Sequence, residues 1–355
     1  MLFGYPIEVT AENWLHESVV EAVERIHEIV EDGQVMPVWP GILPVAYRDR
    51  LENRPALQDR LNVYEAALRN LTLAQRKQTL DALIAQNLIP QLLSCQCDCQ
   101  TVTQLPETIR EPILSLFTFV FSLLTAYEVR QRQYSALYES IQGKICPFCG
   151  CEGLEAPSQP QEDLDHYLPR SKYPFAAANL RNLVPMGGRC NSTYKRAQDP
   201  LRKTNGQRRM ACDPYTAVAV NVSLDESILE EVAAGPIVTE WVIDFYPDNE
   251  AVETWDEIFH VRERWTNNCL SREAFGQWLE SFRSFCRCAN WHVTDDESVI
   301  EAVGRYAELQ ADFGFDDKAF LKAAFFRFLH RRCVDGSQRL ILMLRDAASV
   351  SQSVV

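Results

Sequence analysis

The sequence predicts an α+β protein that is mostly helical and carries a small irregular module of short strands near its centre. Long stretches of the first and last thirds have apolar residues at helical spacing, as in VVEAVERIHEIV. The middle of the chain, from residue 145 to about 215, instead has short apolar runs broken by Gly, Pro and Cys. With 355 residues, of which 46% are hydrophobic and 24% charged, the chain can bury the core of an ordinary globular protein.

The N-terminal region, residues 1–141, is predicted to be helical. Apolar positions at helical spacing occupy 11–33 and 56–93, and the proline-bearing stretch MPVWPGILP between them breaks any helix. Residues 110–141 are then expected to form one long buried helix. Its uncharged run, PILSLFTFVFSLLTAY, is shorter than the roughly 20 apolar residues that a membrane span needs, so the sequence favours a core helix.

The C-terminal region, residues 216–355, is predicted to begin with strands and to continue with helices. TAVAVNVSL and IVTEWVIDF alternate between apolar and polar positions, as half-buried strands do. Helical periodicity then returns in three segments, at 271–290, 297–313 and 317–333. With the module at 142–215, the chain is predicted to have three parts.

The N-terminal residues and the cysteines indicate in which cellular compartment the protein is expected. The opening residues, MLFGYPIEVTAENWLHESVV, lack the basic start, the long apolar run and the small-residue cleavage site of a secretory signal. A cytoplasmic location is therefore expected. In a large chain of this kind, twelve cysteines are interpreted as thiols or metal ligands rather than as a disulfide framework.

The charge of the chain is unevenly distributed. The formal net charge is −14, and an acidic surface repels a polyanion such as nucleic acid. Between residues 166 and 209, however, ten basic residues face a single acid, Asp199, so this segment carries +9 and the remainder of the chain −23. The ten are Arg170, Lys172, Arg181, Arg189, Lys195, Arg196, Arg202, Lys203, Arg208 and Arg209.

The same segment carries the residue types that phosphodiester cleavage needs. Such cleavage takes a base that deprotonates water and a divalent cation that takes up charge on the departing oxygen. His166 is the candidate base. The carboxylate of Asp165 and the amide of Asn191, at the start of a predicted short helix, are hard oxygen donors suited to Mg²⁺. Asn182, just ahead of an apolar LVP strand, is better placed to brace the loop through main-chain hydrogen bonds.

The stretch DLDHYLPRSKYP, followed by NLVP and by CN with a nearby lysine, resembles the HNH endonucleases, which have the ββα-metal fold. The family pattern is an Asp-His at the end of the first strand, an Asn ahead of the second, and a His or Asn on the following helix. The resemblance implies hydrolysis of phosphodiester bonds to a 5′-phosphate and a 3′-hydroxyl, with His166 as the general base. It further implies that Asp165 and Asn191 hold one divalent metal, Mg²⁺ or Mn²⁺, and that Asn182 shapes the loop.

A structural zinc is a further expectation, because many such modules carry two C-x-x-C knuckles. Cys146 and Cys149 form the first knuckle in CPFCG. In the second, MGGRCN, Gly187 stands where the first cysteine would be and only Cys190 remains. Three thiolates are one ligand short of a closed structural zinc site, so the sequence leaves zinc open. The candidates for the fourth ligand are Cys151 and Cys212.

The expected partner is nucleic acid. Arg170, Arg189 and Lys195 are the candidates for contacting its backbone. By resemblance DNA is the expected substrate, with RNA left open. Proteins similar to this one, with an HNH module inside a larger helical chain, occur in bacterial restriction and antiphage defence, often beside an ATPase. The flanks contain no G-x-x-x-x-G-K-[ST] phosphate loop, so any dependence on ATP would come from a partner subunit.

Two interpretations without catalysis use the same residues. The module could be a nucleic-acid-binding domain, or an interaction subunit in which the fold is only a scaffold. The presence of Asp165, His166 and Asn191 together favours the enzyme. Binding without cleavage in Mg²⁺ would favour the first interpretation, and no affinity for nucleic acid would favour the second.

Overall fold

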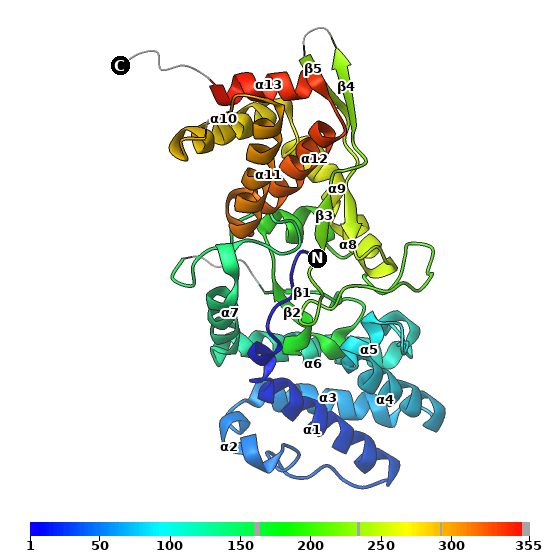
Figure 1. Cartoon of the computed structure of the whole chain (residues 1–355). Coiled ribbons are helices and arrows are strands. Elements are labelled where there is room, and N and C mark those ends of the chain that lie inside the picture. The colour runs from blue at the N-terminus through cyan, green and yellow to red at the C-terminus, as the bar shows by residue number, and fades with distance from the viewer. Residues whose placement is uncertain (160–163, 233–234, 292, 350–355) are drawn as a thin grey trace. The chain divides into compact units, whose positions relative to one another are not determined.

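The computed structural model describes residues 1–159, 164–232, 235–291 and 293–349 (Figure 1). It is mostly helical and of the α+β class, with small two-stranded antiparallel sheets in the middle of the chain. The predicted class is thereby confirmed. Residues 3–141 and 153–218 form one compact unit, and residues 142–152 and 219–355 form a second one.

Helices make up the first part of the N-terminal unit, in agreement with the periodicity of the sequence. Residues Leu15, Val19 and Val23 share one buried face of the first helix, as a spacing of three to four residues requires. Thr72 and Gln75 form a capping box that begins the fourth. The helices of this region are α1 (Trp14–Glu31), α2 (Arg48–Leu51), α3 (Pro55–Arg69), α4 (Leu73–Asn87), α5 (Ile89–Leu93), α6 (Glu107–Ala126) and α7 (Val129–Ser140).

The prediction of one long helix over 110–141 is wrong, because α6 and α7 are separate. The backbone turns at Glu128, whose φ of 57° lies in the left-handed region that interrupts a helix. Among the described residues α6 is the one helix long and apolar enough to cross a membrane by length and composition. Its buried residues, which include Ile113, Phe117 and Val120, recur at helical spacing, and α6 packs against α3.

Two short strands and a short helix follow in the same unit. Strand β1 (Leu164–His166) pairs antiparallel with β2 (Leu183–Pro185), and His166 lies opposite Leu183. The loop between the strands contains two short 3₁₀ turns, Pro174–Ala176 and Leu180–Asn182. After β2 the chain forms a π-helix, Cys190–Lys195.

The C-terminal unit contains the remaining strands and helices. The segment 216–224 was predicted to be a strand, but only its last few residues pair with another strand. The three predicted helices are present, whereas α8, α9 and α13 were not predicted. The elements are β3 (Asn221–Ser223), β4 (Ile228–Val232), β5 (Gly235–Glu240), β6 (Asp244–Tyr246), α8 (Glu250–Phe259), α9 (Val261–Asn268), α10 (Arg272–Cys288), α11 (Asp296–Asp312), α12 (Ala319–Val334) and α13 (Gln338–Ser349).

Candidate active site

Asp165 and His166, at the end of β1, line a cavity of about 330 Å³ in the N-terminal unit. Asn191 and Lys195 line the same cavity from the π-helix. Asn191 and Lys195 are four positions apart in the π-helix, so their side chains lie near the same face of it. Residues that are 30 apart in the sequence thus meet around one small space.

The hydrogen bond of His166 fixes which ring nitrogen carries the proton. Its Nε2 lies 2.9 Å from the carbonyl oxygen of Ala177, and a carbonyl can only accept. Nε2 is therefore the donor, and in the neutral ring Nδ1 keeps its lone pair. The side chain is only 8% exposed. The imidazole is thus oriented by the loop between β1 and β2.

The surroundings of His166 keep the imidazole neutral. Burial lowers its pKa from 6.5 to about 3, because the charged form loses its hydration. The carbonyl of Ala177 opposes this shift. The positive charges of Arg170, Lys195 and Arg130 add to it. A neutral imidazole can take up a proton, which is the property that a general base needs.

Phe121 of α6 and Arg130 of α7 complete the cavity, and sequence reasoning missed both. The Phe121 ring lies 4.4 Å, centroid to centroid, from the His166 imidazole. The guanidinium of Arg130 lies 4.7 Å from that ring centroid and that of Arg170 lies 5.9 Å away. No local pattern marks Phe121, because it comes from the apolar helix predicted to be only core. Its role here depends on tertiary packing.

Asp165 is held by a buried lysine. Lys195 Nζ donates to Asp165 Oδ2 at 2.9 Å and to the main-chain oxygen of His166 at 2.6 Å. The side chain of Lys195 is only 2% exposed, whereas that of Asp165 is 19% exposed. The ammonium therefore lies inside the cavity wall and not on an outer surface. Any phosphate that it contacts would have to enter the cavity.

The oxygen donors present fit one hard divalent cation. Within the described residues, Asp165 Oδ1 and the side chain of Asn191 make no hydrogen bond, and both residues line the cavity. Carboxylate and amide oxygens are the ligands that Mg²⁺ and Mn²⁺ accept, with water or phosphate oxygens filling the other positions. Asp165 and Asn191 could therefore hold such an ion.

Asn182 ties the ends of the loop together. Its Oδ1 accepts from the Leu168 amide at 2.6 Å, and its Nδ2 donates to the carbonyl oxygens of Leu168 at 3.0 Å and Ala176 at 3.1 Å. The side chain is fully buried. These main-chain contacts hold the loop that presents Ala177 to His166, and Asn182 does not line the cavity.

Much of the basic character of the segment 166–209 is neutralised by ion pairs. Arg170 and Arg189 are exposed, and Arg170 lines the cavity. Among the described residues, five of the ten cations of this segment already face carboxylates. The pairs are Lys172 with Asp199, Arg181 with Asp213, Lys195 with Asp165, and Arg202 and Arg208 with Asp98.

The arginines of the basic run RKTNGQRR, residues 202–209, make hydrogen bonds and ion pairs within the protein. Arg202 lies 2.6 Å from Asp98, and Arg208 lies 3.3 Å from it. Arg209 is 3% exposed and donates to the main chain of Asp199. These contacts attach the run to the segment after α5. The residue missed in the sequence was Asp98, which lies more than a hundred positions upstream.

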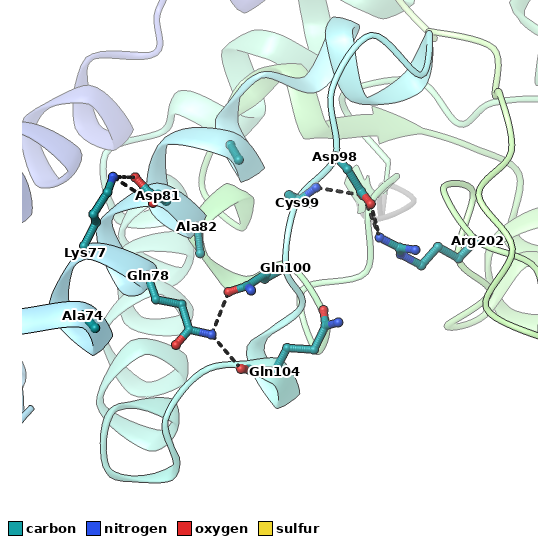
Figure 2. A pocket seen from close by; sticks show the side chains of 11 residues that line it. Ala74, Lys77, Gln78, Asp81, Ala82, Asp98, Cys99, Gln100, Gln104 and Arg202 are labelled. Carbon is teal, nitrogen blue, oxygen red and sulfur yellow. Dashed lines mark hydrogen bonds and ion pairs between the residues drawn. The ribbon is translucent and has the colours of Figure 1, made fainter. Parts of the chain in front are cut away.

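A second, larger cavity of about 500 Å³ lies beside α4 (Figure 2). Its polar groups bond to one another. Gln78 donates to Gln100 Oε1 at 2.9 Å and to the Gln104 carbonyl at 3.1 Å, while Arg202 is directed at Asp98. Because these charges and amides are already paired, the cavity lacks the convergent reactive groups found around His166.

Cys146, Cys149 and Cys190 are fully buried, and their sulfur atoms all lie within 4.8 Å of one another. Tetrahedral zinc with Zn–S bonds near 2.3 Å requires sulfurs roughly 3.8 Å apart. This cluster could therefore bind a metal such as Zn²⁺. Neither expected fourth ligand belongs to the cluster. Cys151 Sγ lies 3.6 Å from that of Cys269, and Cys212 Sγ accepts a hydrogen bond from the amino group of Met1 at 3.4 Å.

No protein family, curated protein or solved structure matches this chain.

Proposed function

We propose that the chain is a metal-dependent endonuclease of the HNH type. The observation that carries the proposal is the state of His166. It is neutral, its Nε2 is engaged by Ala177, and it lies in one cavity with the oxygen donors Asp165 and Asn191. A base and a pair of hard oxygen ligands are the two parts that phosphodiester hydrolysis needs.

Nδ1 of His166 would accept a proton from the attacking water. With a pKa near 3 the free imidazole is a weak base, since a general base works best when its pKa is close to the operating pH. The entering phosphate is anionic and offsets the positive charges of Arg130, Arg170 and Lys195. Substrate would therefore raise the pKa of His166 toward the working range.

A divalent ion on Asp165 and Asn191, when bound, supplies positive charge near the departing 3′-oxygen. Arg170 and Arg196 line the cavity and would attract the phosphates on either side of the scissile bond. Arg189, exposed on the turn before Asn191, is a further candidate for backbone contact.

The proposed substrate is DNA, with RNA as the other possibility to be tested. The resemblance that supports DNA also supports a role in bacterial antiphage defence, with an ATPase as a regulatory partner subunit. A cytoplasmic location is part of the same proposal. We further propose that Cys146, Cys149 and Cys190 hold a structural zinc ion, since three buried sulfurs already lie close together.

The direct test is nicking of supercoiled plasmid by the wild-type protein and by His166→Ala, in Mg²⁺, Mn²⁺ and EDTA, with a parallel assay on labelled RNA. We expect cleavage by the wild type with metal, none in EDTA, and a loss of at least about a hundredfold in His166→Ala. His260→Ala, an exposed histidine outside the cavity, is the control and should cleave normally. Equal cleavage by wild type and His166→Ala would contradict the assignment.

The rival function is nucleic-acid binding without hydrolysis. It predicts that both proteins bind the same oligonucleotide equally and that neither cuts it with any metal. A gel-shift assay run beside the nicking assay separates the two functions. If neither protein binds nor cuts nucleic acid, the module is a protein interaction scaffold.

A further inference from the structure

The buried ammonium of Lys195 forms an ion pair with the carboxylate of Asp165, which is one of the two proposed metal ligands. Its Nζ is 2.9 Å from Asp165 Oδ2, 2.6 Å from the carbonyl oxygen of His166 and 3.4 Å from that of Arg196. An ammonium has three donors, and here it has three acceptors. Because the side chain is 2% exposed, water contributes little to stabilising its charge.

This ion pair and a divalent cation compete for the same group. An oxygen that accepts a hydrogen bond from an ammonium is a weaker metal ligand, and two cations on one carboxylate repel each other. Asp165 Oδ1 makes no hydrogen bond within the described residues, and Asp165 lines the cavity. Lys195 therefore weakens the candidate metal site without closing it.

A phosphate in the cavity would change this balance. The lining of the cavity already contains Arg130, Arg170 and Arg196, and among the described residues that line it Asp165 is the one acid. A phosphodiester would bring a second anion within reach of the Lys195 ammonium, whose flexible stem lets it change partner. Both carboxylate oxygens of Asp165 would then be able to bind the metal.

We propose that Lys195 is a positioning residue that couples metal binding to substrate binding. In the absence of nucleic acid its ammonium stabilises the Asp165 carboxylate and keeps divalent-cation affinity low. With nucleic acid bound, the ammonium moves to a phosphate oxygen and metal affinity rises. The inference rests on the proposed function, because it assumes that Asp165 is a metal ligand.

The backbone that carries Lys195 is irregular, which agrees with such a role. The π-helix Cys190–Lys195 is a rare form that recurs at functional sites. It ends at Arg196, whose φ of 46° and ψ of −126° lie outside the regions that side-chain-bearing residues favour. A regular α-helical turn would have neither the π-helical hydrogen bonds nor the unusual backbone angles of Arg196.

The test measures Mn²⁺ affinity by electron paramagnetic resonance and by calorimetry, without reference to cleavage. Lys195→Met keeps the length of the side chain and removes its charge, and we expect it to bind Mn²⁺ about tenfold or more tightly than the wild type. Lys172→Met is the matched control. Lys172 also pairs with an aspartate, Asp199, at 3.1 Å, but it does not line the cavity. It should change Mn²⁺ affinity less than about twofold.

The coupling is measured by adding a short DNA duplex to proteins that also carry His166→Ala, so that the duplex stays intact. In this background we expect the duplex to raise Mn²⁺ affinity about tenfold, and we expect most of that increase to be absent when Lys195→Met is added. Lys195→Gln, which keeps a hydrogen-bond donor without charge, replaces Lys195→Met if circular dichroism shows that the latter does not fold.

Two outcomes would overturn the inference. Equal Mn²⁺ affinity in wild type and Lys195→Met, or a duplex effect that persists unchanged in Lys195→Met, would show that Lys195 does not compete with the metal. Asp165→Asn separates this failure from a failure of the proposed function. If Asp165→Asn leaves Mn²⁺ binding unchanged, the proposed metal site itself is wrong, and the inference falls with it.

Discussion

Acidification from pH 7 to pH 5 tests the assignment of His166 as a buried neutral base. In the folded protein burial lowers the pKa of His166 from 6.5 to about 3, so the imidazole stays neutral across this range. In the unfolded chain it takes up a proton as the pH falls through 6.5. The unfolded state then binds more protons, so the free energy of unfolding decreases below pH 6.5 and levels off near pH 3.

The size of the effect follows from the two pKa values. Between pH 7 and pH 5, His166 lowers the free energy of unfolding by about 2 kcal/mol. His16 and His27, in the same compact unit, have pKa values lowered by burial to about 4 and each contribute about as much. Together the three lower the free energy of unfolding by about 6 kcal/mol, which is comparable to the whole stability of many domains.

The assay compares wild type and His166→Gln in urea at pH 7 and pH 5, with ¹³C-histidine NMR following the folded state. We expect the substitution to reduce the change in unfolding free energy between pH 7 and pH 5 by about 2 kcal/mol. The NMR resonance that is missing in His166→Gln identifies His166, and in the folded wild type it should not titrate above about pH 4.5. His260→Gln, at an exposed position, is the control. A resonance of His166 that titrates near pH 6.5 in the folded protein would refute the reasoning, because the base would then be solvated.

Four further outcomes are expected. Asn182→Ala should lower the free energy of unfolding by about 2–4 kcal/mol in urea, because it strips three buried main-chain groups of their partners. Arg170→Ala should reduce the salt dependence of DNA affinity by about one unit of slope, whereas Arg202→Ala, which is paired with Asp98, should leave the slope unchanged. Lys195→Met should raise the pKa of His166, since the lysine charge lowers it, and NMR titration measures the direction. Cys146→Ser should remove bound zinc from the purified protein, as measured by elemental analysis, while Cys95→Ser, an exposed thiol, should not.

The sequence predicted best those features that depend on local pattern. Helical spacing of apolar residues located α1 and α11, because each buries one continuous face against its neighbours. The order Asp165-His166, Asn182, Asn191 predicted that these side chains belong to one site. In the structure Asp165, His166 and Asn191 line one cavity. The side chain of Asn182 accepts a hydrogen bond from the main chain of Leu168, in the loop between β1 and β2.

What the sequence could not predict depends on contacts between distant segments. The break between α6 and α7 has no proline or glycine to mark it, since the left-handed residue is Glu128. Phe121 of α6 and Arg130 of α7 reach the cavity only because the folded chain brings these helices beside β1. Lys195 was assigned to the nucleic-acid backbone on its charge, and only the structure reveals that it is buried against Asp165.

The clustering of cations in an acidic chain has two physical explanations that apply to different residues. Lys172 and Arg181 pair with Asp199 and Asp213, and Arg202 and Arg208 share Asp98, so these cations fix loops of the N-terminal unit. The cavity around His166 is different, because among the described residues that line it one carboxylate faces Lys195 and three arginines. That local excess of positive charge would attract a phosphate. The same excess adds to burial in lowering the pKa of His166, and it would oppose a divalent cation on Asp165. On the proposed function, an anion in the cavity would therefore favour both the general base and the metal.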